Sequence, residues 1–425
     1  MSWAPILTSI IRNASKFSRF KVDATLMLLL LSNCAAGQTL TTLYNFGSVA
    51  GDGTNPQTGV VVDGAGNLYG TAALSGNSRG AGSVFQLSPQ GGGSFTENLL
   101  HLFHGTPDGD TPESRLVLMN GTLFGTTLLG GANNMGTVFA TIPPTQPGGP
   151  WTTRILYSFG GMSNDGLNPN AGLLPARPGF YGETMNGGAA GRGTVFKLTP
   201  PVNPGDPWIE TTLYSFKAGG DAAFPSGELA QDASGNLYGT TTLGGSNNFG
   251  AVYQLSPPVG GGWWTESVVY SFHGPDGSSP GGKLFVAKDG TLYGTTSGGG
   301  AHQAGTVFQL IPPVNPGDPW TENVLYSFTG GFDGGGPSAG AILDAQGRIF
   351  GTTSSGGTGT LSGGVIFMLT PAGGGAWNET VLHSFGGNDG FRPLCLLTPN
   401  KGKLFGTTSS GGLFGVGTVF QFDMH

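Results

Sequence analysis

Short stretches rich in Val, Leu, Thr and aromatic residues alternate with clusters of Gly, Pro, Asn and Asp along most of the chain. Such stretches are typical of β-strands separated by turns. One stretch, with the pattern (Leu/Val)-Tyr-Ser-Phe and its variants, returns seven times at intervals of 56 or 57 residues. The seven copies end at Phe46, Phe103, Phe159, Phe216, Phe272, Phe328 and Phe385. The pattern therefore predicts one β-rich unit repeated seven times.

Two further motifs return in the same order within every copy. The Gly of Leu-Tyr-Gly-Thr-Thr and its variants stands at Gly70, Gly125, Gly182, Gly239, Gly294, Gly351 and Gly406. The last residue of Gly-Thr-Val-Phe and its variants stands at Phe85, Phe139, Phe196, Tyr253, Phe308, Phe367 and Phe420. Because all three motifs count to seven, the repeat is not a chance match.

Each copy is long enough for four short strands. In the copy from Pro280 to Phe328, we expect strands at 283–287, 291–296, 306–311 and 320–328. The Pro-rich segment 312–319 separates the last two, because a strand interior does not tolerate such a run of Pro. Four consecutive strands with short connections form an antiparallel meander, which is the blade of a β-propeller.

The two ends of the repeat region predict how the blades close into a ring. The first copy is reduced to its last strand, Thr39 to Phe46, whereas the final copy lacks that strand and stops after Thr418 to Phe422. Pairing the first strand with the last three would complete the seventh blade and hide the exposed strand edges. An open solenoid would gain nothing from this offset. We therefore predict an all-β fold, a seven-bladed β-propeller of four-stranded antiparallel blades whose last blade is closed by the N-terminal strand.

The first 37 residues differ from the repeats. Four cationic residues precede an apolar run from Ala24 to Leu31, and small residues follow at Ala35, Ala36 and Gly37. This order predicts a secretory signal peptide over residues 1–37 and a seven-repeat propeller over 38–425. Lipidation at Cys34 is the alternative. The apolar run is too short for a transmembrane helix, and no later segment approaches the required length. We expect a secreted or extracellular protein with no transmembrane segment after cleavage.

Composition and charge limit the classes of partner that we expect for the protein. The 81 Gly and 29 Pro act as turn residues, because the 27 Phe, 10 Tyr and 7 Trp recur at fixed places in a way that disordered chains do not show. Residues 38–425 carry 13 Lys and Arg against 23 Asp and Glu. We therefore expect no nucleic-acid partner. Only Cys395 remains after cleavage, so no internal disulfide is expected, and we interpret it as a core residue.

The three motifs resemble the tandem GloVer repeat, as Leu-Tyr-Gly-Thr-Thr (292–296), Gly-Thr-Val-Phe (305–308) and Val-Leu-Tyr-Ser-Phe (324–328) illustrate. The resemblance covers nearly all of the chain after Gly37. It implies a bacterial extracellular protein of the choice-of-anchor tandem-repeat type. It implies no reaction and no catalytic residues. Because the chain ends at His425 without an apolar tail, we expect free secretion rather than anchoring at that end.

The most regular polar feature lies in the loop between the fourth strand of one copy and the first strand of the next. There an Asp is followed four residues later by Pro in all seven copies. The aspartates are Asp52, Asp108, Asp165, Asp221, Asp276, Asp333 and Asp389. These loops and the Gly-rich loops share one face of a propeller, so the seven carboxylates predict a rim. They are candidates for binding a polyol or Ca²⁺. Alternatively, each Asp accepts hydrogen bonds within its own turn.

Residues that break the repeat are the other functional candidates. Glu183 replaces the usual Thr and is a candidate catalytic acid or base. Arg392 and His302 are candidates for the binding rim, and Glu113 and Arg115 flank the second rim loop. Drift within a loop would explain the same differences.

The chain lacks the nucleophile-elbow, zinc-protease, Cys-x-x-Cys and phosphate-loop motifs. No metal-ligand spacing repeats among its six His, so we assign no cofactor, with Ca²⁺ as an open alternative. We expect a monomeric binding or interaction module for a glycan or protein, rather than an enzyme. A carbohydrate-active hydrolase or lyase using Glu183 is the alternative.

Overall fold

The computed structural model describes residues 39–49, 51–75, 80–146, 148–203, 205–217, 219–315, 317–359 and 361–424. Every regular element in this part of the chain is a β-strand. A search of the same residues finds no helix long and apolar enough to cross a membrane. The predicted signal peptide over 1–37, with Cys34, lies outside the described residues.

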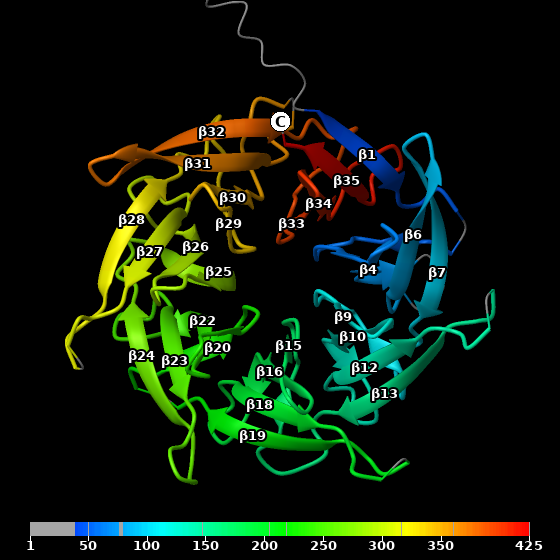
Figure 1. Ribbon diagram of the computed structural model, residues 1–425, viewed down its shortest axis with the longest axis horizontal. Helices are drawn as coiled ribbons and strands as arrows, with labels where there is room; N and C mark the ends of the chain where they lie inside the picture. The colour runs from blue at the N-terminus through cyan, green and yellow to red at the C-terminus, as the bar shows by residue number, and fades with distance from the viewer. Residues whose placement is uncertain are drawn as a thin grey trace, which may run out of the picture. The chain divides into compact units, whose positions relative to one another are not determined.

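Seven antiparallel sheets stand around a common axis, and each is one blade of a β-propeller (Figure 1). From the axis outward, blade 1 contains β3 (Val61–Val62), β4 (Leu68–Ala72), β6 (Ser83–Gly91) and β7 (Ser94–Leu102). Blade 2 contains β9 (Val117–Met119), β10 (Thr122–Thr127), β12 (Thr137–Ile142) and β13 (Thr152–Ser158). Blade 3 contains β15 (Leu174–Pro175), β16 (Phe180–Thr184), β18 (Thr194–Thr199) and β19 (Ile209–Ser215). Blade 4 contains β21 (Ala230–Gln231), β22 (Leu237–Gly244), β23 (Ala251–Ser256) and β24 (Thr265–Ser271), and β20 (Ala222–Pro225) also pairs with β22. Blade 5 contains β25 (Ser278–Val286), β26 (Leu292–Gly298), β27 (Thr306–Ile311) and β28 (Thr321–Ser327). Blade 6 contains β29 (Ile342–Leu343), β30 (Ile349–Thr352), β31 (Val365–Gly373) and β32 (Ala376–Ser384). The predicted fold class is confirmed.

The N-terminal strand closes the ring. Blade 7 contains β33 (Thr398–Asn400), β34 (Lys403–Thr408), β35 (Thr418–Asp423) and, as its outermost strand, β1 (Leu40–Asn45). Leu40 pairs with Phe422 and Asn45 with Thr418, in antiparallel register. The predicted pairing of the two chain ends is therefore confirmed.

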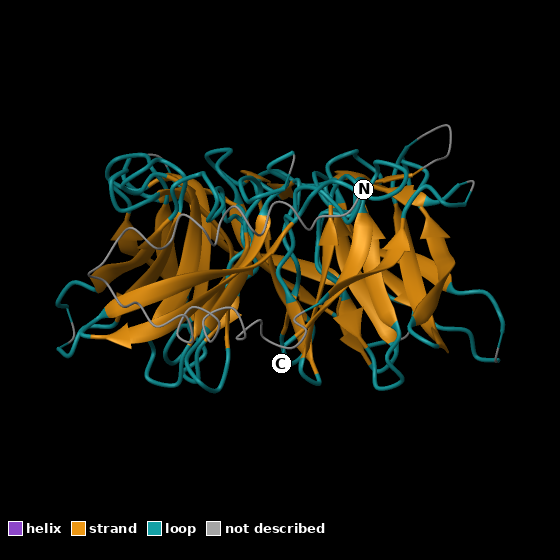
Figure 2. Ribbon diagram, turned by 90° about the horizontal axis from the view of Figure 1, so that it is seen from above, coloured by secondary structure: helices purple, strands orange, loops and turns teal. Residues whose placement is uncertain are grey.

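The loops that precede the innermost strands pair with the Gly-rich loops of the same blade. Three small two-stranded ladders show this pairing: β2 (Gly53–Thr54) with β5 (Leu74–Ser75), β8 (Gly109–Asp110) with β11 (Leu129–Gly130), and β14 (Gly166–Leu167) with β17 (Asn186–Gly187). Both kinds of loop therefore lie on one face of the ring, which we call the loop face. Figure 2 shows the strands spanning the thickness of the ring between loops on its two faces.

Close packing explains why two of the repeated motifs belong together. In blade 1, a Cβ built on Gly70 would lie 2.5 Å from the ring of Phe85, the aromatic residue of the neighbouring strand. The same contact occurs at Gly294 with Phe308, also at 2.5 Å. The tip of each ring therefore lies directly against a glycine of the adjacent strand, and only glycine leaves room for it.

Aromatic contacts also join one blade to the next. Phe46 of blade 7 meets Phe85 of blade 1 edge to face, with ring centroids 5.1 Å apart. The repeated Phe residues of the outer strands are fully buried in the same way in every blade. Trp151 of blade 2 contacts Tyr69 of blade 1. Buried aromatic area between blades therefore holds the ring together. Cys395 is a buried free thiol, 1% exposed, as its interpretation as a core residue requires.

Candidate functional site

A cavity of about 260 Å³ lies on the axis of the ring, and residues from all seven blades line it. We call it the axial cup. The first residue after the repeated Pro contributes Gln57, Glu113, Asn170, Ser226, Ser338 and Leu394. The third residue contributes Gly59, Arg115, Gly172, Glu228, Lys283 and Leu396. Because side chains of a strand alternate, the first and third residues of each innermost segment face the axis.

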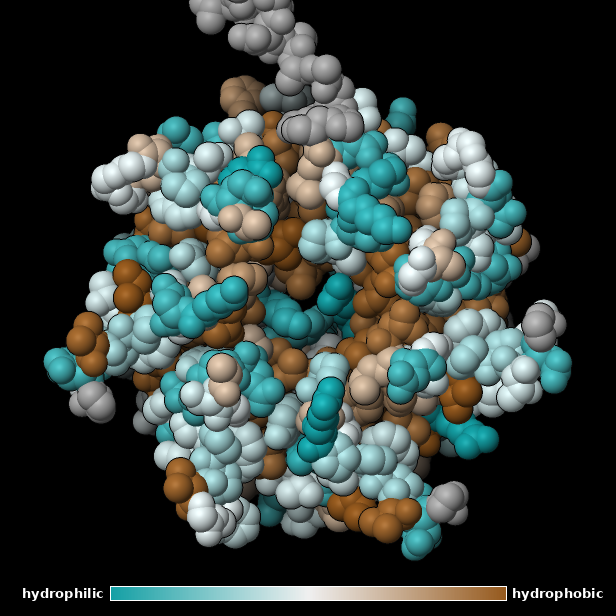
Figure 3. Space-filling view, in the orientation of Figure 1, coloured by the Kyte–Doolittle hydropathy of each residue, from teal (hydrophilic) through white to brown (hydrophobic). Residues whose placement is uncertain are grey.

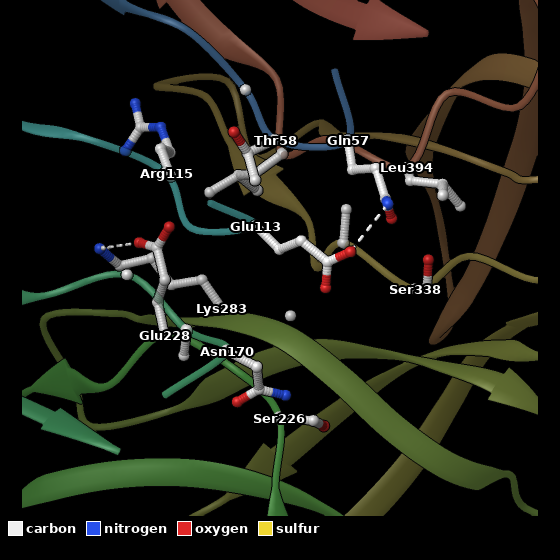
Figure 4. A pocket seen from close by; sticks show the side chains of 16 residues that line it. Gln57, Thr58, Glu113, Arg115, Asn170, Ser226, Glu228, Lys283, Ser338 and Leu394 are labelled. Atoms are coloured by element: carbon white, nitrogen blue, oxygen red, sulfur yellow. Dashed lines mark hydrogen bonds and ion pairs between the residues drawn. The ribbon is translucent and has the colours of Figure 1, made fainter. Parts of the chain in front are cut away.

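The first of these two layers is polar and mostly uncharged. Glu113 lies at its centre in Figure 4, with Asn170, Ser226 and Ser338 around it. Gln57 donates a hydrogen bond from Nε2 to Oε1 of Glu113, over 3.1 Å. Asn170 Oδ1 and Ser226 Oγ are buried and have no hydrogen-bond partner among the described residues. Buried polar atoms are nearly always paired with protein or ordered water, so these two atoms are available to a bound molecule.

The second layer carries charge. Lys283 Nζ lies 3.3 Å from Glu228 Oε2 and forms an ion pair between blades 5 and 4 (Figure 4). Arg115 donates from Nη2 to Thr398 Oγ1 over 3.1 Å, whereas its buried Nε has no partner among the described residues. In Figure 4 the guanidinium of Arg115 points away from Glu113. This layer therefore presents two cations and one carboxylate below the polar layer.

Apolar residues follow further along the axis. Two adjoining hollows are lined by residues such as Val61, Val117, Leu174, Phe285 and Ile342. Figure 3 shows the centre of the ring hollowed, with hydrophobic side chains on its walls. Arg115 and Lys283 border both these hollows and the axial cup. The polar lining of the axial cup thus ends where the apolar residues of these two hollows begin.

Burial changes the acidity of the central carboxyl. Loss of solvent raises the pKa of Glu113, and the hydrogen bond from Gln57 opposes this rise. A raised pKa means that the protonated form of Glu113 is favoured more than in water. Glu113 can therefore act as a hydrogen-bond acceptor or, when protonated, as a donor to a bound molecule.

The seven predicted rim aspartates lie at the seams between blades, where each forms hydrogen bonds within its own loop. Asp52 accepts from the backbone N–H of Gly47 and from the hydroxyl of Tyr44. Asp165, Asp221, Asp276 and Asp333 also accept from a Tyr, whereas Asp108 and Asp389 contact a His. None of the seven lines the axial cup. This geometry agrees with the interpretation that each Asp accepts hydrogen bonds near its own turn.

The other two rim candidates are also apart from the cup. His302 is exposed on a Gly-rich loop. The side chain of Arg392 is exposed, and its backbone N–H bonds to the carbonyl of Gly363. Among the residues that the structure describes, no group of three or more His, Cys, Asp or Glu could hold a metal ion.

Glu183 is 1% exposed and lies in β16, between blades 3 and 4. Its Oε1 accepts a short hydrogen bond from the hydroxyl of Tyr253. Burial raises the pKa of Glu183, although the bond from Tyr253 lowers it. Neither side chain lines the axial cup. The position is sealed inside the ring.

The remaining copies explain what Glu183 does there. A Thr takes its place, and its hydroxyl bonds to the backbone of the next blade. In five copies the Thr donates to a backbone carbonyl, from Thr71 to Ser114, Thr126 to Ala171, Thr240 to Gly282, Thr352 to Cys395 and Thr407 to Thr58. In the sixth, Thr295 accepts from the backbone N–H of Gly340. Glu183 makes the equivalent connection to the next blade through Tyr253, which itself replaces the usual Phe. The two departures from the repeat therefore form one structural pair.

The sequence singles out Glu113 and Arg115, and the structure places both in the axial cup. It does not single out Asn170, Ser226 or Lys283. A usable signal exists, because the first and third residues after the repeated Pro vary between copies while the surrounding motif stays the same, although Ser recurs twice at the first position and Gly three times at the third. What the sequence does not reveal is that these positions meet on one axis.

Comparisons with known proteins agree with the repeat and the fold. A model of the Gloeobacter/Verrucomicrobia repeat matches residues 30–148, 98–265, 140–316 and 260–425. No curated protein sequence matches the chain. An ancestral GH74 enzyme is similar in structure, with a TM-score of 0.52 and 14% identity over 91% of this chain and 51% of that one. At this identity the similarity concerns the fold alone.

Two further solved structures are less similar. One, from Bacteroides uniformis, is provisionally described as a 6-phosphogluconolactonase; its TM-score is 0.49, with 13% identity over 78% of this chain and 85% of that one. The other is a protein of unknown function from Dyadobacter fermentans, with a TM-score of 0.45 and 12% identity over 92% and 99% of the two chains.

Proposed function

The chain belongs to the Gloeobacter/Verrucomicrobia repeat family, and from this premise we propose that it is an exported propeller that binds a glycan through its axial cup. The bound part is one terminal sugar unit, held by hydrogen bonds. The observation that carries the proposal is the pair of buried, unpartnered polar atoms, Asn170 Oδ1 and Ser226 Oγ, beside the carboxyl of Glu113.

The cup differs between copies where the fold does not require a difference. Gln57, Glu113, Asn170 and Ser226 occupy the same position in successive repeats, yet no two are alike. Positions that hold the blades together, such as the buried Phe of each outer strand, are repeated instead. A ligand without sevenfold symmetry needs this kind of asymmetric lining, so the variation supports a binding site on the axis.

Hydroxyl groups match the chemistry of the lining. Asn170 Oδ1 is an acceptor, Ser226 Oγ can donate or accept, and Glu113 has acceptor capacity beyond its bond from Gln57. A sugar offers several hydroxyls that both donate and accept. The volume of about 260 Å³ lies just below the roughly 300–1,000 Å³ typical of sites for drug-sized molecules. One sugar unit is therefore a better fit than a longer segment.

The export part of the proposal rests on the order of cationic, apolar and small residues in the first 37 positions. Expression of the full chain in a bacterial host, followed by fractionation and N-terminal sequencing, tests it. We expect the protein outside the cytoplasm, with its signal peptide cleaved near Ala36 or Gly37. Cytoplasmic protein that retains Met1 would contradict export. A mature chain that begins at a lipid-modified Cys34 would show lipidation in place of cleavage near Ala36.

Glycan arrays, followed by calorimetry with the best glycan, test the binding site. We expect Asn170→Ala and Ser226→Ala each to weaken binding by about 10-fold or more, because each removes a buried polar contact worth about 1–3 kcal/mol. Asn203→Ala is the matched control, since Asn203 is exposed on an outer loop and should leave the affinity unchanged.

Three results would overturn the proposal. If no glycan binds but an extracellular protein does, or if the cup variants bind as well as the wild type, the axial cup is not a glycan site. If glycan fragments are released and Glu113→Gln or Glu228→Gln abolishes their release, the chain is a hydrolase or lyase rather than a binding module.

A further inference from the structure

Five of the seven seams between neighbouring blades carry the same three side chains. A Tyr of one outer strand and the Asp of the following loop face a Glu on the outer strand of the next blade. The sets are Tyr44, Asp52 and Glu97; Tyr157, Asp165 and Glu210; Tyr214, Asp221 and Glu266; Tyr270, Asp276 and Glu322; and Tyr326, Asp333 and Glu379.

The Tyr hydroxyl donates a hydrogen bond to one oxygen of each Asp. In all five seams it lies between 2.6 and 3.1 Å from Oδ2 of the Asp. Because the carboxylate accepts this bond and at least one backbone N–H, it is well stabilised on that side. The Asp of each seam therefore accepts hydrogen bonds that favour its carboxylate form, although burial raises the pKa of Asp52.

Several of the remaining carboxyl oxygens have no donor, whereas Asp276 Oδ1, Asp333 Oδ1 and Glu210 Oε1 accept from His273 N–H, Thr329 and Thr212. Asp52 and Asp165 are each only 5% exposed, and Oδ1 of both is buried without a hydrogen-bond partner among the described residues. Oε1 of Glu97, Glu266 and Glu322 is buried without a partner as well. In a seam such as that of Asp52 and Glu97, two carboxyl groups thus each have a buried oxygen without a donor, and the charge of the Asp acts on the Glu. Two negative charges in this position would repel each other at low dielectric constant.

The other two seams differ in two residues at once. His101 and His383 replace the Tyr and lie 3.0 and 2.6 Å from the Oδ2 atoms of Asp108 and Asp389. In the same seams the position of the Glu is taken by Thr153 and by Leu40. The strand registers establish this equivalence, because Glu97, Thr153 and Leu40 pair with Leu87, Thr141 and Phe422 of the adjacent strands. Every seam therefore has one further titratable side chain beside its Asp, a Glu in five and a His in two.

We propose that the five Tyr–Asp–Glu seams are proton-binding sites, in which the Glu of one blade takes up a proton beside the Asp that follows the neighbouring blade. The proton leaves solvent and binds the Glu carboxylate, so each seam keeps one negative charge. This inference is independent of the axial cup and its ligand. It makes the closure of the ring sensitive to pH.

A proton suits the seam better than a metal cation. Calcium takes six to eight oxygen ligands, whereas a seam offers two carboxyl groups and a Tyr hydroxyl that already donates. The described residues contain no cluster of three or more metal-binding side chains. Pairs of carboxyl groups that share one proton are a known solution to the same crowding.

The acidity of the five Glu agrees with this geometry. Burial, followed by the charge of the facing Asp, raises the pKa of each from the ordinary value of 4.5 to about 7. A hydrogen bond to Asp221 also raises the pKa of Glu266, while the nearby Lys217 lowers it. The other titratable neighbours are His273, which contacts Asp276, and His383, which borders a hollow with Asp333 and Glu379.

The direction of the pH effect follows from these values. An acid with a raised pKa in the folded state binds more protons there than in the unfolded chain. Its contribution to stability is fully present below about pH 4.5 and is lost as the pH rises through about 7. The ring should therefore be less stable at pH 8.5 than at pH 5.

Thermal unfolding of the full chain between pH 5 and pH 8.5 tests the proposal. The variant Glu97→Gln, Glu266→Gln, Glu322→Gln keeps a hydrogen-bond donor facing each Asp but has no proton to lose. We expect it to match the wild type at pH 5 and to melt on the order of 5 °C higher at pH 8.5. The His residues are the same in both proteins, so the difference isolates the Glu. Asp318→Asn, on an exposed outer loop, is the matched control and should follow the wild type.

An infrared measurement distinguishes proton binding by the Glu from a general effect of the substitutions on packing. The wild type should show the C=O band of protonated carboxyl groups at pH 6, and this band should fade by pH 8.5 and be weaker in the triple variant. If that variant does not fold, the single variant Glu322→Gln carries the same test with a smaller shift. Equal melting curves for wild type and variant at every pH would overturn the proposal. So would stabilisation by Ca²⁺ at pH 8.5 that the Glu→Gln changes remove, which would assign the seams to a cation.

Discussion

Single residues decide where the blades can pack. A Cβ on Gly70 would meet the Phe85 ring at 2.5 Å, so a methyl group has no room there. Gly64 lies in a turn of the same blade, and nothing lies within 4 Å of the position of its Cβ. The two glycines are close in sequence, yet only one is required by packing.

Substitution of these glycines by Ala should separate the two roles. We expect Gly70→Ala to lower the free energy of unfolding by about 1–3 kcal/mol, because the added methyl group displaces a buried ring. Gly64→Ala should leave it within about 0.5 kcal/mol of the wild type. Urea unfolding followed by fluorescence measures both. Equal effects of the two substitutions would refute the packing argument.

The pair of Glu183 and Tyr253 offers a second test at this scale. Tyr253→Phe alone should destabilise the protein by about 1–3 kcal/mol, because it leaves a buried carboxyl without its hydrogen-bond partner. Glu183→Thr combined with Tyr253→Phe restores the side chains of the other copies and should recover most of the loss. A double-mutant cycle measures the coupling. A double variant as unstable as Tyr253→Phe alone would show that the two residues do not act as a pair.

Among the strands, β1 has a role that no other strand has. It is separated from its blade by nearly the whole chain, and it supplies the outermost strand of blade 7. Phe46 follows it and is fully buried against Phe85 of blade 1. The strand therefore contributes to two blades at the point where the ring closes.

Removal of residues 39–46 should cost on the order of 5 kcal/mol or more, because it exposes a strand edge and empties a seam. Phe46→Ala tests the same contact more gently and should cost about 3–5 kcal/mol. Thr41→Ala, at an exposed position of β1, should have little effect. Chemical denaturation with far-UV circular dichroism gives all three values. An unchanged stability after the deletion would argue against closure by this strand.

For the whole molecule, closure ties every blade to two neighbours. The aromatic contacts and Thr bonds described above cross each seam in turn, so loss of one blade exposes the cores of two others. We expect a single unfolding transition in which Trp fluorescence, which reports on the seams, coincides with circular dichroism, which reports on the strands. Two separated transitions would indicate that groups of blades unfold independently, as in an open repeat array.

Much of this architecture is predictable from the sequence, for a physical reason. Each blade uses the same contacts, so the residues that make them recur: Gly294 under Phe308, or Phe328 at the end of its strand. The strand order and the closure by residues 39–46 follow from that repetition alone. The turn role of the rim aspartates is also readable, because Asp and Gly recur together in a loop.

The tertiary structure decided where function can reside. Gln57, Asn170, Ser226 and Lys283 are far apart in the chain and carry no motif, and they become a site only because the ring brings the innermost strands of the blades to one axis. Glu183 is conspicuous in the sequence but sealed between blades, since its partner Tyr253 lies in the next repeat. Local pattern thus determines the blade and its count, whereas closure of the ring determines which variable residues meet.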